Sequence, residues 1–205
     1  MLKYFLFILL FFSFNNLSGM EKPYHHIYKD GGLFAFRNPE GGPQRDPNFK
    51  WKWKVFREEK KKLKINYPPE HVIDKQIVLK NLQKHKSDSF VMWLDHASFI
   101  IKLGDTTIIT DPVFEKNYGP LWFGPKKFVD SPLTLKELPE INVFLLTHNH
   151  YDHMSIRTIK NFPYKNSKAL MPLKLGKYFT RNGYKKNNVK EMDWFDKIKL
   201  MMISR

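Results

Sequence analysis

The chain from residue 89 onward carries short apolar runs separated by turn residues, which is the pattern of β-strands. Strands rich in β-branched and aromatic residues are predicted at 90–94, 98–103 and 106–110. Only Gly104 and Asp105 separate the last two, and glycine at the first central position of a two-residue loop favours a type II′ hairpin. The strand that ends at Thr110 then delivers Asp111 into the following loop.

Strands and helices alternate in the second part of this region. The pattern predicts a strand at 143–147, a helix at 155–162, a strand at 169–171, a helix at 173–182 that Gly183 ends, and a strand at 189–194. Between the two parts, residues 117–139 are rich in proline and glycine, which predicts loops that shape a rim. The mixture of strands and short helices indicates an α/β (α+β) fold over residues 89–205.

Residues 20–88 differ in composition, because they are rich in glycine, proline and charge. They predict an irregular, largely extended basic lead-in to the domain. Within it, residues 50–64 interleave Trp51, Trp53 and Phe56 with basic side chains. One interpretation is an interfacial patch whose rings lie among lipid headgroups and whose lysines contact phosphates. The other, more typical of charge runs, is a solvated segment whose aromatic rings pack on the core.

The first residues have the outline of a secretory signal. Lys3 precedes an unbroken apolar run from Tyr4 to Phe12, and small and polar residues follow. The run is too short to span a bilayer comfortably, which requires about 20 apolar residues. We therefore expect residues 1–19 to be a signal peptide or an uncleaved N-terminal anchor, and the protein to be exported to the periplasm or the cell-envelope membrane.

Composition narrows the chemistry. At 205 residues, with 42% hydrophobic residues, the chain suits one domain with a buried core. Its formal net charge of +15 favours anionic partners such as phospholipid surfaces, phosphodiesters or nucleic acid. The signal-like N-terminus argues against nucleic acid, so we expect a phospholipid substrate or an anionic membrane surface. The absence of cysteine excludes thiolate ligands and a cysteine nucleophile, so histidine, aspartate or glutamate must hold any metal.

The most informative stretch is HNHYDH at 148–153, which follows an apolar run. His148 and His150 are two residues apart, so on an extended backbone both side chains point to the same side and can hold one metal ion. Asp152 and His153 follow where the chain turns toward a helix, and they can bind a second ion a few ångströms away. Because this combination is rare, the stretch predicts a binuclear metal site, with Asp152 as the candidate catalytic residue.

The motif resembles that of the metallo-β-lactamase superfamily, whose members form an αββα sandwich with the metals at one edge of the two sheets. Asp111 matches the upstream aspartate that supports the metal loops in this superfamily without binding metal itself. Further blocks resemble the N-acylphosphatidylethanolamine-hydrolysing phospholipase D branch and its bacterial outer-membrane-type relatives: WLDHAS at 93–98, TDPVF at 110–114, GPKKF at 124–128, SP at 131–132 and ELP at 137–139. At position 95 that branch usually has glycine where this chain has Asp95.

The resemblance implies zinc-dependent hydrolysis of a phosphodiester on N-acylated phosphatidylethanolamine, which releases phosphatidic acid and an N-acylethanolamine. It also implies two zinc ions, the first held by His148 and His150 and the second by Asp152 and His153. The family pattern adds a later histidine for each zinc and a bridging aspartate, but none of the eight histidines follows His153. We therefore expect residues 89–205 to form the N-terminal half of the sandwich, truncation to impair activity, and a separate C-terminal fragment to act as a complementing partner.

His96 lies in the block at 93–98 and could approach the metal rim, where it would support the site together with Asp111. The alternative, which is more common for a lone histidine, is that His96 makes a structural hydrogen bond.

Two other functions fit the same residues. The metal motif does not select a substrate, so a lactonase or a nuclease on this scaffold is one alternative. The other is a non-catalytic, membrane-associated remnant, which would bind no zinc and would adsorb to anionic vesicles in a salt-dependent way.

Overall fold

The computed structural model describes residues 25–30, 32–36, 39, 52, 54–55, 58, 68–119, 124–127 and 129–200. The chain divides into two compact units, residues 1–64 and 65–205. In the first unit, β1 (His26–Lys29) and β2 (Gly32–Phe36) pair as an antiparallel hairpin. The expected signal segment at 1–19 and most of the aromatic and basic stretch at 50–64 lie outside the described residues. None of the helices in the described part is long and apolar enough to span a bilayer.

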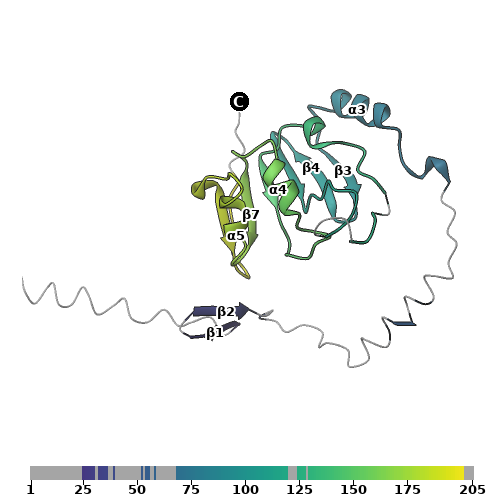
Figure 1. The fold of residues 1–205 in the computed structure, drawn as a ribbon. Helices are drawn as coiled ribbons and strands as arrows, with labels where there is room; N and C mark the ends of the chain where they lie inside the picture. The colour runs from purple at the N-terminus through teal and green to yellow at the C-terminus, as the bar shows by residue number, and fades with distance from the viewer. Residues whose placement is uncertain are drawn as a thin grey trace, which may run out of the picture. The chain divides into compact units, whose positions relative to one another are not determined.

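The second unit is built on a six-stranded sheet in the order β3-β4-β5-β6-β7-β8 (Figure 1). The strands are β3 (Phe90–Asp95), β4 (Ser98–Leu103), β5 (Thr106–Thr110), β6 (Val143–Leu145), β7 (Lys168–Pro172) and β8 (Val189–Met192). The helices described in this unit are α3 (Lys75–Lys84), α4 (Ile156–Asn161) and α5 (Gly176–Thr180), with 3-10 turns at Pro69–His71, Leu135–Glu137 and Lys186–Asn188. Strands β3 to β5 are antiparallel, whereas β5 to β8 are parallel.

The antiparallel half follows the predicted pattern closely. Strands β4 and β5 have the predicted bounds, and β3 is one residue longer than predicted. Gly104 has a φ of +55°, while Asp105 is not among the residues with positive φ. A positive φ at the first central position alone is what a type II′ turn requires, so the predicted hairpin is confirmed.

The parallel half contains the predicted elements in the predicted order, with shifted ends. Helix α4 begins after Ser155, whose side chain accepts a 3.0 Å hydrogen bond from the Thr158 amide as an N-cap. Helix α5 begins at Gly176 and not at residue 173, because Lys174 adopts a left-handed φ of +71° that interrupts a helix. Gly183 has a φ of +95° in the turn after α5, as expected of a glycine that follows a helix.

Helix α3 lies within the stretch that was expected to be irregular, and the sequence prediction is wrong there. The side chain of Asp74 caps it by accepting a 2.8 Å hydrogen bond from the Gln76 amide. Val78 is buried in the core, and Lys75 forms a 2.6 Å ion pair with Glu137. The glycine- and proline-rich composition ends before Asp74. The prediction is wrong because it uses the composition of the whole lead-in and not the capping residue Asp74 and the helix-forming residues that follow it.

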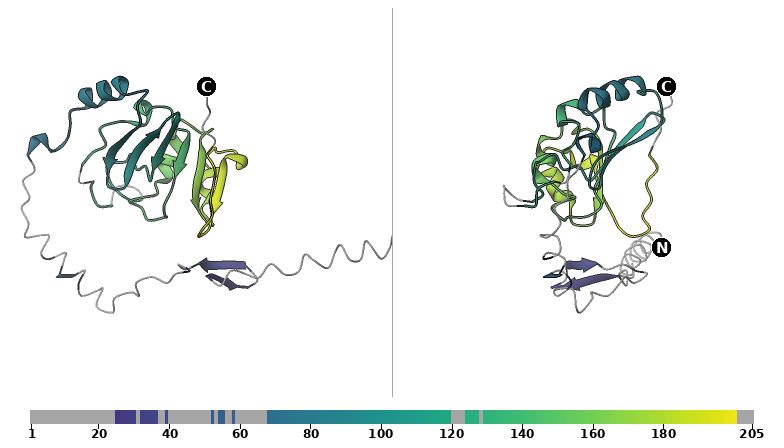
Figure 2. Two further views of the ribbon diagram at one scale, coloured as in Figure 1. Left: turned by 180° about the vertical axis from the view of Figure 1, so that it is seen from behind. Right: turned by 90° about the vertical axis from the view of Figure 1, so that its right-hand side faces the viewer.

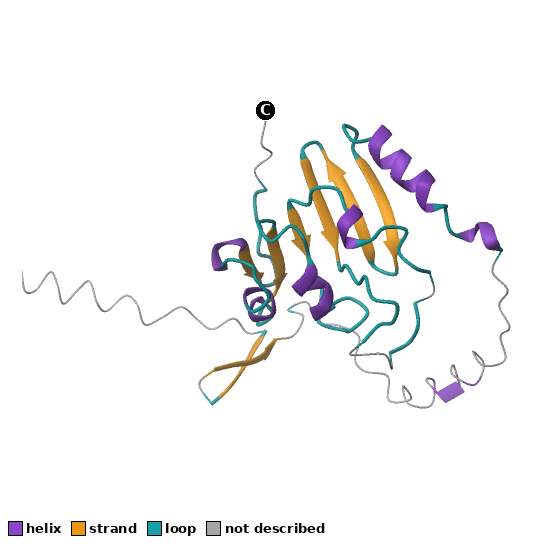
Figure 3. Ribbon diagram, turned by 45° about the horizontal axis from the view of Figure 1, so that its top comes forward, coloured by secondary structure: helices purple, strands orange, loops and turns teal. Residues whose placement is uncertain are grey.

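One face of the sheet packs on the helices. Viewed from both sides, α4 and α5 lie on the same face (Figure 2), and α3 lies near the β3 edge (Figure 3). Phe144 on β6 is at the centre of this layer, with its ring centroid 5.0 Å from those of Phe162 and Phe179. On the opposite face of β3, Val91 and Trp93 are 66% and 50% exposed. The hydrophobic core thus lies between the sheet and its helices.

Candidate metal centre

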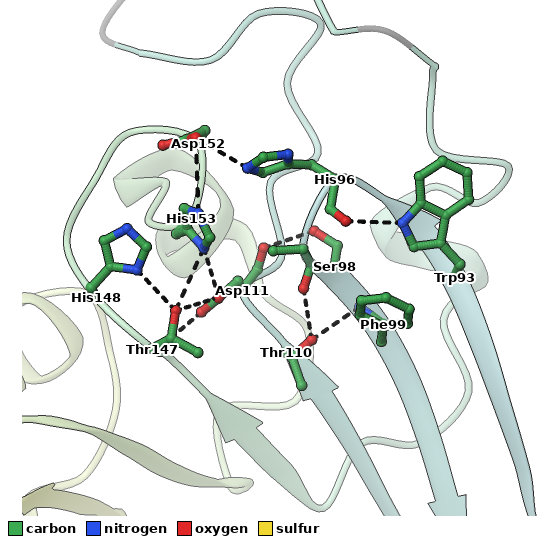
Figure 4. A network of polar contacts seen from close by, with 11 residues as sticks. Trp93, His96, Ser98, Phe99, Thr110, Asp111, Thr147, His148, Asp152 and His153 are labelled. Carbon is green, nitrogen blue, oxygen red and sulfur yellow. Dashed lines mark hydrogen bonds and ion pairs between the residues drawn. The ribbon is translucent and has the colours of Figure 1, made fainter. Parts of the chain in front are cut away.

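Three connections of the second unit meet at one end of the sheet. Strands β3 and β5 both run antiparallel to β4, and β6 runs parallel to β5, so the C-terminal ends of β3, β5 and β6 coincide. His96 lies in the turn after β3, Asp111 follows β5, and the predicted motif follows β6 (Figure 4). Residues far apart in the sequence therefore converge at this edge.

Asp111 is the anchor of the site, and its side chain is 1% exposed. One carboxylate oxygen accepts a 2.7 Å hydrogen bond from the Thr147 amide, and the other accepts one of 2.5 Å from the Thr147 hydroxyl. The second oxygen also lies 2.8 Å from Nδ1 of His153. This carboxylate fixes the proton on Nδ1 of His153 and leaves Nε2 free for a metal.

His148 is oriented by the same network. Its Nδ1 lies 3.0 Å from the Thr147 hydroxyl, and its ring centroid lies 4.6 Å from that of His150 and 3.9 Å from that of His153. Burial, and then the neighbouring imidazoles of His153 and His150, lower the pKa of His148. The lowered pKa favours the neutral imidazole, which is the form that binds a metal ion.

Asp152 faces two imidazoles. One of its carboxylate oxygens lies 3.0 Å from Nε2 of His96 and 3.8 Å from Nε2 of His153. Figure 4 shows these three side chains turned toward one another. The structure therefore brings together all four predicted metal ligands and both predicted supporting residues. His96 therefore lies at the rim of the motif, and its 3.0 Å contact with Asp152 is compatible with either a hydrogen bond or a supporting role at the metal.

A short turn presents the motif. The amides of His153 and Met154 both donate to the carbonyl oxygen of His150, at 3.0 and 2.7 Å. Met154 is 8% exposed and packs in the core, and Ser155 then caps α4. The loop that carries the motif is followed directly by a buried side chain and a helix cap, so its C-terminal end is fixed.

A rim loop within the predicted loop region 117–139 lies beside the motif. Tyr118, Gly119, Gly124 and Pro125 line a cavity of about 620 Å³ together with Asn149, His150, Tyr151 and Asp152. The Tyr118 amide donates a 2.9 Å hydrogen bond to the Pro125 carbonyl. A Cβ at Gly124 would lie 1.3 Å from the Tyr118 carbonyl oxygen, so only glycine fits there.

Tyr118 keeps its proton in this cavity. Burial, and then the carboxylates of Asp95 and Asp152, raise the pKa of Tyr118 above its ordinary value of 10.0. Its phenol is thus a hydrogen-bond donor at neutral pH. No motif marks a lone tyrosine in a proline-rich loop, so the sequence carried no signal for it.

Asp95, where the related branch usually has glycine, is 1% exposed and forms an ion pair with Lys127. The Lys127 ammonium also donates to the Val113 carbonyl and lies 5.7 Å from the centre of the Tyr118 ring. The second carboxylate oxygen of Asp95 has no hydrogen-bond partner among the residues that the structure describes. Lys127 compensates the buried charge and ties the rim loop to the end of β3.

The donors available to a metal at this end of the sheet are imidazole nitrogens and carboxylate oxygens, a set that suits zinc and other divalent transition metals. A family model described as the β-lactamase superfamily domain matches residues 90–198, which include every candidate ligand. The chain belongs to this family. The predicted superfamily and the mixed α/β fold class are thereby confirmed.

Among its relatives is N-acyl-phosphatidylethanolamine-hydrolyzing phospholipase D 1 of Caenorhabditis elegans, which is 31% identical over 115 residues, 53% of this chain and 32% of the relative. The mitochondrial N-acyl-phosphatidylethanolamine-hydrolyzing phospholipase D of Saccharomyces cerevisiae is 28% identical over 109 residues, 53% of this chain and 23% of the relative. A solved structure of a possible metal-dependent hydrolase from Veillonella parvula aligns with a TM-score of 0.44 and 21% identity, over 54% of this chain and 44% of the other. The matched part spans about a third or less of the length of these curated relatives.

Proposed function

We propose that this protein is a zinc-dependent hydrolase that cleaves a phosphodiester bond in N-acylated phosphatidylethanolamine-type lipids. The observation that carries the proposal is the set of three imidazoles and one carboxylate that follows β6 and is anchored by buried Asp111. The names of the nematode and yeast relatives support the choice of substrate.

His148 and His150 would hold one ion, and Asp152 and His153 the other. A divalent metal bound there would polarise a phosphoryl oxygen and make a water molecule more acidic. Asp111 accepts a hydrogen bond from Nδ1–H of His153, so Nε2 is the nitrogen left to bind the metal.

Three side chains that line the cavity can handle protons or contact substrate. Asp152 lines the cavity, and its carboxylate oxygens can accept a proton from an entering water molecule. The Tyr118 hydroxyl remains protonated and lines the same cavity, so it can donate a hydrogen bond to a phosphoryl oxygen. Tyr151, which is 63% exposed at the cavity, offers a ring for contact with a lipid headgroup region.

Export to the cell envelope is part of the same proposal. The apolar run from Tyr4 to Phe12 after Lys3 supports it. The net charge of +15 supports attraction to an anionic membrane surface, where such a lipid substrate would lie.

The proposal is tested with the purified full chain, zinc and vesicles that contain an N-acylated phosphatidylethanolamine, by mass spectrometric detection of released N-acylethanolamine. We expect release that chelation abolishes and that His150→Ala abolishes. His85→Ala is the matched control, because His85 is an exposed histidine that also contacts a carboxylate, that of Asp88, at 2.7 Å. A zinc-loaded chain that releases no more product than the chelated chain contradicts the proposal.

A further inference from the structure

We infer that His96 is a direct ligand of a divalent metal ion that Asp152 and His153 also bind, so that the described residues alone provide a three-ligand site. His96 lies outside the HNHYDH motif, in the turn between β3 and β4. The inference rests on the metal-binding part of the proposed function and adds a ligand to it.

The donor atoms converge as a metal requires. One ligand atom from each of His96, Asp152 and His153 can be chosen so that all three lie within 4.8 Å of one another. The two contacts made by the Asp152 carboxylate are 3.0 Å to His96 and 3.8 Å to His153. Zinc bonds of about 2.0–2.2 Å in a tetrahedral arrangement place ligand atoms roughly 3.3–3.6 Å apart. Two imidazoles and one carboxylate with an open fourth position form a donor set typical of catalytic zinc.

The surroundings restrain both imidazoles. Asp111 binds Nδ1 of His153, so Nε2 is the atom presented to Asp152. The His96 ring lies between two others, with centroids 5.0 Å from that of His153 and 5.5 Å from that of Tyr118. The His96 carbonyl accepts a 2.9 Å hydrogen bond from the indole of Trp93, which fixes the turn that carries it.

The backbone of His96 is in a conformation that disfavours a side chain. Its φ is +34°, in the left-handed region where glycine is preferred. Five non-glycine residues in the described part of the chain have positive φ, and two of them, His96 and Asp111, belong to this site. Strain of this kind collects at functional sites, because a side chain is retained where a glycine would fold more easily. The strain supports a role for the imidazole itself.

A simple hydrogen bond between histidine and aspartate offers the matched comparison. His85 and Asp88 form such a pair at 2.7 Å, and the His85 side chain is 44% exposed, against 43% for His96. The His96–Asp152 pair differs because the Nε2 atom of His153 approaches the same carboxylate oxygen. Convergence of a third donor is what distinguishes a metal site from an ion pair.

The test is titration of the metal-free full chain with Zn²⁺ and Co²⁺, in which affinity and the visible spectrum of cobalt are measured. Removal of an outer-sphere partner typically weakens metal binding by about 10–100-fold. We expect His96→Ala to weaken binding of one ion by more than this and to change the cobalt bands, because one nitrogen ligand is lost. His85→Ala is expected to change neither.

His96→Gly separates loss of a ligand from loss of folding. Glycine relieves the positive φ, so we expect the metal-free variant to melt at or above the temperature of the unaltered chain while its metal affinity falls as in His96→Ala. Wild-type affinity and spectrum in a folded His96→Gly overturn the inference. A loss of only about 10–100-fold with an unchanged cobalt spectrum overturns it too, in favour of a residue that positions Asp152. Neither readout depends on lipid hydrolysis, so failure of the proposed function is seen separately.

Discussion

The antiparallel and parallel halves of the sheet build the metal centre in different ways. The parallel half supplies most of the donors from one loop, between Thr147 and His153 after β6. The antiparallel half supplies two side chains, those of His96 and Asp111. Both residues have a positive φ, which is strained for a residue other than glycine. The loop that is richest in ligands is thus oriented by contacts that the other half of the sheet supplies, above all those of the Asp111 carboxylate.

Hydrogen bonds between the turn after β3 and the end of β5 restrain this orientation. The Ser98 hydroxyl donates a 2.7 Å hydrogen bond to the Asp111 carbonyl, and the Thr110 hydroxyl donates one of 2.9 Å to the Ala97 carbonyl (Figure 4). These bonds join the turn that carries His96 to the strand end that carries Asp111. The antiparallel half thus presents its two side chains as one unit.

The largest expected change in the free energy of unfolding comes from the hydrophobic core of the parallel half. Phe144 is 1% exposed and packs against α4 and α5 through Phe162 and Phe179. We expect Phe144→Ala to lower the free energy of unfolding by about 3–5 kcal/mol, as measured by urea denaturation. Phe195→Ala is the control, because Phe195 is 68% exposed and its truncation should change stability by less than about 0.5 kcal/mol. Equal losses in both variants would show that this core does not hold the half together.

The buried ion pair of Lys127 and Asp95 tests the end of β3. We expect Lys127→Met to cost about 3 kcal/mol, because the Asp95 carboxylate is left charged and unpaired at 1% exposure. The double variant Asp95→Gly with Lys127→Met should recover most of this loss, since no charge remains buried. Urea denaturation measures the free energy of unfolding of the two variants. A double variant no more stable than Lys127→Met would contradict the role of Lys127 in compensating the buried charge of Asp95.

Asp111→Asn tests the link between the halves. An amide cannot accept all three hydrogen bonds that the carboxylate receives from Thr147 and His153, and one amide group would face a donor. We expect a loss of about 1–3 kcal/mol in stability and about 10–100-fold in zinc affinity. Urea denaturation and zinc titration measure the two effects. His85→Ala is the reference, since His85 lies outside the site and its loss should spare zinc affinity; equal zinc affinities in the two variants would show that Asp111 does not orient the metal ligands.

The smallest expected effect lies away from the centre, where α3 contacts the 3-10 turn at Leu135–Glu137. The Lys75 ammonium, and then the Thr134 amide, lower the pKa of Glu137 from 4.5 to about 2. A lowered carboxyl pKa stabilises the folded state above the unfolded pKa, and the contribution disappears as pH falls from about 4.5 to about 2. Thermal melts should show Glu137→Gln slightly less stable than the unaltered chain at pH 7, with the difference vanishing in that window. A difference that is independent of pH would contradict the ion pair.

Local features of the fold and of the site were predictable from sequence. The hairpin at Gly104 followed from turn chemistry, and β4 and β5 followed from their β-branched residues. The proximity of His148 to His150 followed from spacing alone, because neighbours in sequence are neighbours in space. The late start of the second predicted helix did not, because nothing in the sequence marks the left-handed φ of Lys174.

The long-range features were out of reach of the sequence. The pairing of His96 with Asp152 and of Lys127 with Asp95 joins segments that only the sheet brings together. No periodicity or spacing reports such contacts, and the rim position of Tyr118 depends on the same tertiary arrangement. The resemblance indicated the motif's chemistry and the upstream residues Asp111 and His96, but only the folded chain showed the atoms through which these two side chains contact the motif.

The metal centre is tested most directly by X-ray absorption at the zinc edge of the zinc-loaded full chain after gel filtration. We expect nitrogen and oxygen neighbours at about 2.0–2.2 Å together with the outer-shell signal of imidazole. The imidazole signal should fall in His153→Ala and persist in His85→Ala. Zinc lost on gel filtration, or zinc surrounded by oxygen without an imidazole signal, would contradict the central claim that this end of the sheet is a metal centre.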